Sequence, residues 1–395
     1  MKGPLAPYAT GFYAELINQG YAHGSARNQM VLMSRVSHWM IETGLRTSEL
    51  TLEAVDPFVA LRRAQGRERG ISPRGMAPLL GYLRRIGAAP EPSSEAPATT
   101  ELETLLAEYR TYLAKERGVA ARTVEHYLTP ARLFLSKRSE MDGLGLKDLT
   151  AVEVTGFVVH ATRGRRTGLA QWIVTGMRAL LRFLHVSGKI SSPLAQVVPG
   201  VASWRLSTLP RALEPYQVDR LLASCDQTTP AGVRDLAILT ALIRLGLRAG
   251  EVAALELRDI DWRHGEIVIH GKGNRVERLP LPADVGQAIV TWLQVGRLVG
   301  SDAHVFTRIP APHRGLAAAG VSMVVRSAAI RAGLPRVSAH RLRHTAATQM
   351  LRSGASLAEI GQVLRHHSPE ATAIYAKVDR TSLSGLARPW PGDVI

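Results

Sequence analysis

The sequence contains a single cysteine, Cys225. One cysteine cannot form an internal disulfide, and it cannot supply the several thiolates of a zinc or iron–sulfur cluster. Cys225 ends the apolar stretch 221–225, which has helical character, so we expect a small buried residue rather than a nucleophile. The sequence therefore gives no sign of disulfide or cysteine-based metal chemistry.

Long apolar runs and aromatic residues are also scarce. The longest apolar run, 236–243, is far shorter than the roughly 20 residues that cross a bilayer. Residues 1–5 carry no apolar stretch of the kind that a secretory signal needs. We therefore expect a cytoplasmic protein without a membrane partner. Aromatic residues make up 5% of the chain, and the abundance of Ala, Leu and Arg favours helices.

Acidic residues are too few to balance the basic ones. The chain has 33 Asp and Glu against 49 Lys and Arg, a net charge of +16. Such an excess indicates a polyanionic partner, with nucleic acid as the first candidate and an acidic membrane surface as the second. Basic residues cluster in 62–74 and in a second stretch without any acid. A solvated face is the ordinary meaning of such runs, but two of them favour phosphate contacts. The candidate DNA-binding residues of the second stretch are Arg163, Arg165, Arg166, Arg178, Arg182 and Lys189.

Two proline-rich stretches divide the chain. They predict an N-terminal helical module (1–88), a linker (89–100), a second helical domain (101–190), a second linker (191–212) and a C-terminal domain (213–395). The two helical parts align with each other: Gly20 matches Gly118, Arg35 matches Arg132, and 50–59 matches 149–158. This pattern favours an internal duplication, with two unrelated helical domains as the alternative.

The C-terminal domain changes period along its length. Helical spacing over 215–223 and 233–245 gives way to alternating or β-branched segments at 259–262, 266–270 and 276–281, separated by glycines. These segments predict a three-stranded antiparallel sheet with tight turns. Helices resume at about Asp284, a capping box at 356–359 opens one of them, and Ser368-Pro369 has the pattern that opens a last one. The predicted fold class is mainly α with a small antiparallel β-sheet.

Four elements of this domain carry groups that bind or transfer charge. Arg248 lies between two glycines, and Glu251 is placed to hold its guanidinium while the fork binds an oxyanion. Lys272 lies in the glycine-rich turn between the second and third strands. Taken alone, these are the features of a surface ion pair and a solvated turn lysine.

The other two elements follow near the C-terminus. His340 and Arg343 share one helix face, where a histidine can exchange a proton and an arginine can bind two phosphate oxygens. We assign His344 a supporting structural role, capping or packing behind Arg343. His366 precedes Tyr375 by nine residues, and a tyrosine on an apolar helix is ordinarily half buried.

The complete set suits a phosphodiester. Cations bind the non-bridging oxygens and offset the charge that builds in the transition state, while a phenol attacks phosphorus and a proton donor releases the 5′-oxygen. Because protein cations can do this work, and because no residues have metal-ligand spacing, the sequence predicts no metal and no cofactor.

Residues 246–262, 270–281, 340–351 and 364–379 together resemble the catalytic domain of the tyrosine recombinase (phage integrase-like) family. The resemblance implies that Tyr375 forms a 3′-phosphotyrosyl link and that Lys272 is the general acid toward the 5′-hydroxyl. The residues that it places around the scissile phosphate are Arg248, Lys272, His340, Arg343 and His366. Residues 101–190 resemble the helical, SAM-like core-binding domain, which implies a multi-domain clamp around DNA.

Three features depart from minimal members of that family. Arg365 stands where glycine is usual, and either a phosphate contact or a solvent-facing side chain would explain it. His367 is a second candidate imidazole, although the spacing to Tyr375 favours His366. The module 1–88 is additional and is typical of recombinases from phages and transposable elements.

The resemblance implies a site-specific DNA recombinase or integrase. It would act on double-stranded DNA sites as a homotetramer through a Holliday junction, in the cytoplasm at the nucleoid, with accessory or sister recombinases as further candidate partners. A type IB topoisomerase-like enzyme and a catalytically silent DNA-binding regulator are the alternatives. The clamp and the tail after Tyr375 favour the recombinase, and the complete set of groups argues against a silent relative.

Overall fold

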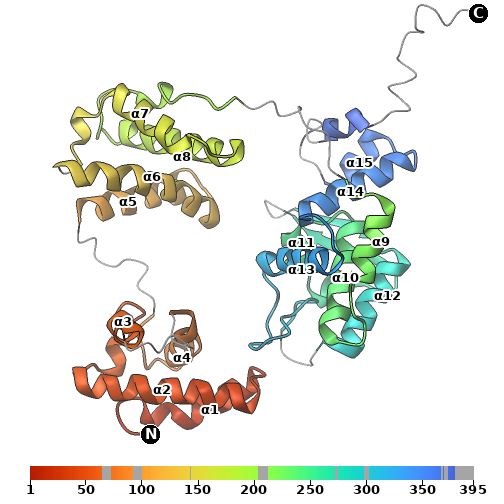
Figure 1. Cartoon of the computed structure of the whole chain (residues 1–395), viewed down its shortest axis with the longest axis horizontal. Helices are drawn as coiled ribbons and strands as arrows, with labels where there is room; N and C mark the ends of the chain where they lie inside the picture. Colours follow the sequence, from red (N-terminus) through yellow and green to blue (C-terminus); the bar gives the residue numbers. More distant parts are fainter. Residues whose placement is uncertain are drawn as a thin grey trace, which may run out of the picture. The chain divides into compact units, whose positions relative to one another are not determined.

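The computed structural model describes residues 1–64, 73–91, 100–142, 144–202, 212–271, 275–297, 302–365, 368 and 372–378 (Figure 1). The chain divides into two compact units. One unit joins Met1–Pro90 with Leu206–Ile395, and the other is Glu91–Arg205. Within the described residues, no helix is both long and apolar enough to span a membrane.

In its described residues, the N-terminal part of the first unit contains four helices. These are α1 (Ala9–Asn18), α2 (His23–Thr43), α3 (Asp56–Ala64) and α4 (Pro73–Arg85), with short 3-10 turns at Ala6–Tyr8 and Thr47–Glu49. Their apolar faces enclose a core that includes Phe12, Trp39 and Phe58. Gly44 ends α2 in the left-handed conformation that a glycine adopts without strain.

The second unit is also helical. It contains α5 (Glu101–Thr111), α6 (Ala121–Asp142), α7 (Ala151–Thr162) and α8 (Thr167–Val186), with shorter turns at Tyr112–Glu116, Leu146–Asp148 and Leu194–Gln196. Thr100 and Thr150 cap α5 and α7 through their side chains. The core gathers around α8 and includes Leu180, Leu184 and Tyr109.

The two helical groups repeat the same series of elements. In each, a short helix is followed by a long one, a 3-10 turn and two further helices. Gly20 and Gly118 both have positive φ, +84° and +57°. Thr51 and Thr150 accept a backbone hydrogen bond from the residue three positions on, at 3.0 and 3.3 Å. A duplication would produce these agreements, and common ancestry stays a prediction.

The C-terminal part of the first unit is built around α10 (Pro230–Arg244). Almost every residue from Val233 to Ile243 is buried, because α10 packs against α12 (Ala283–Thr291), α13 (Ala318–Arg331) and α14 (Ala339–Arg352) (Figure 1). The remaining elements are α9 (Pro215–Ala223), α11 (Ala249–Ala254), α15 (Leu357–Val363) and the short turns Leu257–Asp259, Trp292–Gly296 and η8 (Ile374–Val378).

The three predicted strands form one antiparallel sheet. β1 (Ile260–Asp261), β2 (Glu266–His270) and β3 (Val276–Pro280) pair in the order β1-β2-β3. Ile267 lies opposite both Ile260 and Leu279, and these apolar side chains face the core because alternate residues of a strand share one face. The expected fold class, mainly α with a small antiparallel sheet, is confirmed.

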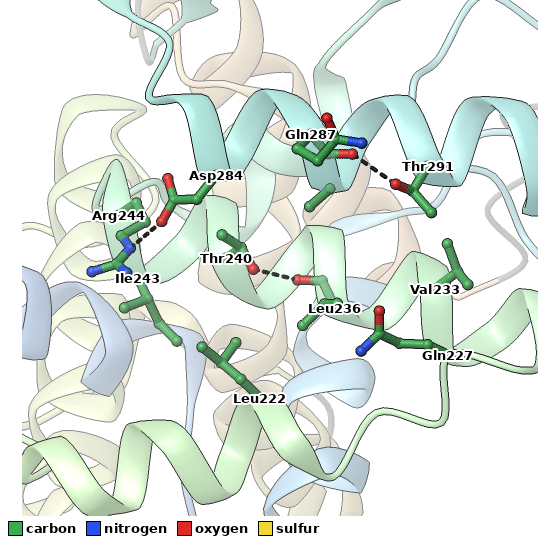
Figure 2. A pocket seen from close by; sticks show the side chains of 11 residues that line it. Leu222, Gln227, Val233, Leu236, Thr240, Ile243, Arg244, Asp284, Gln287 and Thr291 are labelled. Carbon is green, nitrogen blue, oxygen red and sulfur yellow. Dashed lines mark hydrogen bonds and ion pairs between the residues drawn. The ribbon is translucent and has the colours of Figure 1, made fainter.

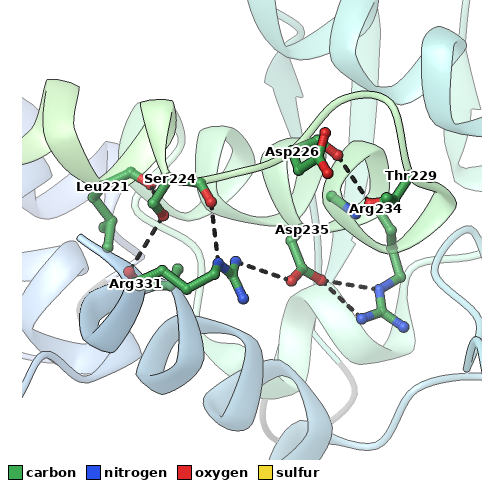
Figure 3. Close-up of polar contacts among 9 residues, drawn as sticks. Leu221, Ser224, Asp226, Thr229, Arg234, Asp235 and Arg331 are labelled. Carbon is green, nitrogen blue, oxygen red and sulfur yellow. Dashed lines mark hydrogen bonds and ion pairs between the residues drawn. The ribbon is translucent and has the colours of Figure 1, made fainter. Parts of the chain in front are cut away.

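A polar network centred on the buried Asp235 connects α13, α10 and the end of α9 (Figure 3). Arg331 on α13 donates to the carbonyl oxygen of Ser224 at 3.0 Å and to Asp235 Oδ2 at 3.4 Å. Arg234 donates to Asp235 Oδ1 at 2.8 Å. Asp235 is buried, and its two guanidinium partners compensate for the desolvation of its charge. Cys225, at the end of α9, is buried as predicted.

A cavity of about 350 Å³ lies between α9, α10 and α12 (Figure 2). Its walls include Leu222, Leu236 and Ile243, and Arg244 pairs with Asp284 at its edge at 2.6 Å. Its lining contains none of the predicted catalytic residues, so the candidate site lies elsewhere.

Candidate active site

Arg248 caps the start of α11 and is paired with Glu251. Gly246, two residues earlier, has φ +58°, and a Cβ there would lie 2.4 Å from a methyl carbon of Leu364. The backbone N–H of Arg248 donates to Glu251 Oε2 at 2.8 Å, and its Nη1 donates to Oε1 at 2.6 Å. The Arg248 side chain is 40% exposed, so its guanidinium is oriented by the carboxylate and still accessible to a ligand.

Arg343 ties α14 to two loops. Its Nη1 donates to the carbonyl oxygen of Gly246 at 2.6 Å, and its Nη2 donates to the carbonyl oxygen of Leu364. The residue is only 3% exposed. Burial lowers the pKa of Arg343 to about 10, with the charges of Arg248 and Arg365 adding to the effect, so the guanidinium stays protonated at neutral pH.

Arg365 brings a third guanidinium to the same carboxylate. It is 8% exposed and has φ +55°, the one positive φ of a non-glycine residue within the described ranges. Its Nη2 donates to Glu251 Oε2 at 2.9 Å, and its Nη1 donates to the carbonyl oxygen of Val363 at 2.9 Å. Of the two explanations for an arginine at this position, the solvent-facing side chain is wrong, because Arg365 is buried against Glu251. The phosphate contact stays a prediction.

Glu251 is therefore shared by two arginines. Burial alone would raise the pKa of Glu251, but the hydrogen bond from the Arg248 backbone and the charges of Arg365 and Arg248 lower it below the ordinary value. Glu251 is thus an ionised, buried carboxylate that fixes both side chains.

Two histidines on α14 lead to the candidate nucleophile. Ser338 caps the helix, and His340 and His344 lie one turn apart on the same face. His344 Nδ1 lies 2.8 Å from Tyr375 Oη, and His344 Nε2 lies 3.0 Å from His340 Nε2. Tyr375, in η8, is 1% exposed. His344 was expected to cap the helix or pack behind Arg343, whereas its ring is hydrogen-bonded to the phenol.

Burial controls the protonation of these three side chains. It raises the pKa of Tyr375 to about 12, although the charge of Arg343 opposes the shift. It lowers the pKa of His344 to about 4, with His340 and Arg343 contributing. It also lowers the pKa of His340, with contributions from Arg343 and Arg248. At neutral pH the site therefore holds a neutral phenol and neutral imidazoles among arginine charges.

The structure brings together six of the predicted site residues: Arg248, Glu251, His340, Arg343, His344 and Tyr375. Lys272 and His366 lie outside the described residues, and so does Pro369 of the expected helix start Ser368-Pro369. Sequence reasoning missed the direct contact of His344 with Tyr375. The spacing of four residues from His340 was the available signal.

The candidate DNA-binding residues of the second unit fall into two groups. Arg163, Arg165 and Arg166 are exposed at the turn between α7 and α8, and Arg182 is exposed on α8. The other two have partners in the unit. Arg178 donates to the carbonyl oxygen of Val198 at 2.9 Å, and Lys189 pairs with Glu108 at 2.8 Å.

In the part of the chain that the structure describes, no three His, Cys, Asp or Glu side chains are grouped as metal ligands. The arginines, histidines and phenol that are described here have the chemistry to bind an anion beside the hydroxyl of Tyr375.

Comparisons with known proteins identify the family of the chain. A family model described as the phage integrase family matches residues 211–382. The chain is 39% identical over 395 residues to a predicted integrase/recombinase, y4rA, of Sinorhizobium fredii (strain NBRC 101917 / NGR234), covering 99% of this chain and 96% of that one. It is 30% identical over 287 residues to the tyrosine recombinase XerC of Roseiflexus sp. (strain RS-1), covering 71% and 91%.

Solved structures show the same fold. The XerH site-specific recombinase bound to palindromic difH substrate matches with a TM-score of 0.58 and 20% identity, covering 71% of this chain and 83% of that one. A lambda integrase tetramer bound to a Holliday junction matches with a TM-score of 0.53 and 16% identity, covering 73% and 81%.

Proposed function

Since the chain belongs to the phage integrase family, it is a tyrosine-type site-specific recombinase, and we propose that it cleaves and rejoins double-stranded DNA through a 3′-phosphotyrosyl link on Tyr375. The observation that carries this proposal is the hydrogen-bonded phenol of Tyr375 beside two oriented arginines, Arg248 and Arg343.

The proposed reaction begins with binding of the scissile phosphate. The partly exposed fork of Arg248 binds a non-bridging oxygen, and the buried charge of Arg343 adds to the positive potential. Tyr375 Oη attacks phosphorus and the 5′-oxygen leaves. The unshifted phenol pKa is already near 10, and burial raises it further, so the attack needs a proton acceptor. Lys272 is the proposed donor to the leaving oxygen, and His366 is a proposed phosphate ligand.

The second unit supplies the proposed grip on the duplex. The exposed residues Arg163, Arg165, Arg166 and Arg182 are its proposed phosphate contacts. Arg178 and Lys189 would have to release Val198 and Glu108 to join them, so they are the weaker candidates. The N-terminal helical group, with its similar series of elements, is proposed to extend the grip. The division into domains 1–88, 101–190 and 213–395, joined by linkers 89–100 and 191–212, is part of this proposal.

We further propose that the chain assembles as a homotetramer on DNA and that its reaction passes through a Holliday junction. A lambda integrase structure is described as a tetramer bound to such a junction. A location at the nucleoid in the cytoplasm, a phage or transposable element as the source, and accessory or sister recombinases belong to the same proposal. They follow from the reaction and from the additional N-terminal module.

The test uses the full chain and nicked suicide DNA drawn from the ends of the genetic element that carries the gene. We expect a protein–DNA adduct that survives denaturing detergent and maps to Tyr375. An adduct on another residue such as Ser338 would contradict the assignment. Supercoil relaxation by a monomer, without strand exchange between sites, would favour the topoisomerase-like alternative. Specific binding with no adduct would favour the silent regulator.

A further inference from the structure

A line of hydrogen bonds leads from the buried phenol of Tyr375 to the protein surface. Tyr375 is 1% exposed and contacts His344, whose other ring nitrogen contacts the exposed residue His340. The two links measure 2.8 and 3.0 Å, within ordinary hydrogen-bond range. A proton that leaves the phenol therefore has a direct route out of the core through one imidazole.

A neutral imidazole has one donor nitrogen and one acceptor nitrogen, so two arrangements of protons satisfy these bonds. Only the arrangement in which the phenol donates lets Tyr375 pass its proton on. In that arrangement the phenol donates to His344 Nδ1, and His344 carries its own proton on Nε2 and donates it to His340 Nε2. His340 then carries its own proton on Nδ1. All three side chains are neutral in this arrangement, and each contact has one donor and one acceptor.

On this basis, and resting on the proposed function, we propose that His344 is a catalytic residue that accepts the proton of Tyr375 and relays a proton to His340. As the Oη–phosphorus bond forms and the phosphorus–O5′ bond breaks, the phenolic proton moves to His344 Nδ1. The Nε2 proton of His344 moves to His340 Nε2 in the same event. The 5′-oxygen leaves with the electron pair of the broken bond. Rejoining runs the same transfers in reverse and restores the phenol.

The electrostatics favour a relay over storage of the proton on His344. Burial, His340 and Arg343 hold the pKa of His344 at about 4, so a lasting positive charge there is unfavourable. The His340 residue is exposed, so water can reach its imidazolium. Burial of its ring is the largest cause of the lowered pKa of His340, and the charges of Arg343 and Arg248 add to it. A bound phosphate offsets both charges, which makes His340 a better final acceptor when substrate is present.

The test compares His344→Asn and His344→Phe with wild type in the full chain. The amide oxygen of asparagine lies close to the position of Nδ1 and can keep the phenol in place, but it cannot pass a proton on. We expect both variants to bind DNA normally and to form the Tyr375 adduct about 10²–10⁴ times more slowly at neutral pH.

The pH profile separates a relay from a structural role. The groups around His344 are His340, Arg343 and Tyr375, and Arg248 acts on His340. Wild type should show a rate that levels off above the pKa of His340. The variants should instead gain about tenfold per pH unit, because hydroxide must then remove the phenolic proton. A rate reduced by the same factor at every pH would overturn the relay.

Two further measurements complete the test. In a substrate with a 5′-bridging sulfur, the 5′-thiolate leaves without needing a proton, so the slow adduct formation of the His344 variants should persist. If sulfur restored their rate, His344 would act on the leaving group, and the proposal would be refuted. His23→Asn is the matched control, because Tyr13 Oη and His23 Nδ1 make a similar contact at 3.0 Å in the N-terminal helical group. Its adduct rate should equal wild type.

The outcomes also distinguish the relay from the function beneath it. An adduct on Tyr375 that forms at the wild-type rate in both His344 variants refutes only the relay. Absence of any adduct in wild type refutes the proposed function itself.

Discussion

Arg343 and Arg248 are expected to be equally necessary for cleavage and unequal in their effect on stability. Arg343 is 3% exposed, and its two terminal nitrogens hold the carbonyl oxygens of Gly246 and Leu364. Arg248 is 40% exposed along its side chain and makes one ion pair, with Glu251. Replacing each with alanine therefore removes very different amounts of structure.

The magnitudes follow from these contacts. A hydrogen bond from a charged donor contributes about 1.5–3 kcal/mol, so the two bonds of Arg343 contribute roughly 3–6 kcal/mol before the cost of burying its charge is subtracted. A domain is stable by only about 5–15 kcal/mol, so Arg343→Ala should loosen the site substantially. Arg248→Ala keeps the backbone bond to Glu251, and the buried Glu251 keeps Arg365 as a partner, so the loss of the half-exposed Arg248 guanidinium costs only about 1 kcal/mol.

Hydrogen exchange in the full chain measures this difference. Peptides that cover 243–248 and 357–365 should exchange much faster in Arg343→Ala and nearly normally in Arg248→Ala. Both variants should lose about 3 kcal/mol or more of transition-state stabilisation, a drop in adduct formation of roughly a hundredfold or more. Both should still bind DNA, because binding is spread over many phosphates. Equal exchange in the two variants would refute the reasoning.

Four shorter predictions concern the same site. Tyr375→Phe should fold, losing about 1 kcal/mol with the bond to His344, and should form no adduct on denaturing gels. Gly246→Ala should lower both melting temperature and cleavage rate, because φ is +58° and the new methyl would meet Leu364; an unchanged melting temperature would contradict this. The folded pKa of Glu251 is lowered, so its contribution to stability is present above about pH 4.3 and is lost as pH falls through the folded value. Glu251→Gln should therefore flatten the acid limb of an unfolding curve, measured by circular dichroism. A chelator should leave the adduct rate unchanged, and restoration of a lost rate by a divalent ion would show a metal requirement.

Local sequence signals predicted the local structure well. The sheet lies where alternation and glycine turns placed it, and α9 has the predicted bounds 215–223. The helix expected at 233–245 begins earlier, at Pro230, because Thr229 caps it and proline suits the first turn.

Contacts between distant segments could not be predicted in the same way. Glu251 and Arg365 are 114 residues apart, and nothing in either segment shows that the second guanidinium folds back onto the carboxylate. His344 and Tyr375 are 31 residues apart, and their hydrogen bond depends on how η8 packs against α14. The sequence predicted which residue types form the site, but which of them pair with each other depends on the tertiary structure.

The single carboxylate of Glu251 leaves the site with an excess of positive charge. Arg248, Arg343 and Arg365 bring three positive charges and Glu251 brings one negative charge, which leaves two positive charges without a counter-ion within this group. A phosphodiester supplies one of the missing charges, so the substrate acts as a structural ligand as well as a reactant. The site should therefore become more rigid when a phosphate-like anion binds. Binding of the scissile phosphate then reduces the electrostatic repulsion among the three arginines, so the site is most stable when substrate is in place for cleavage.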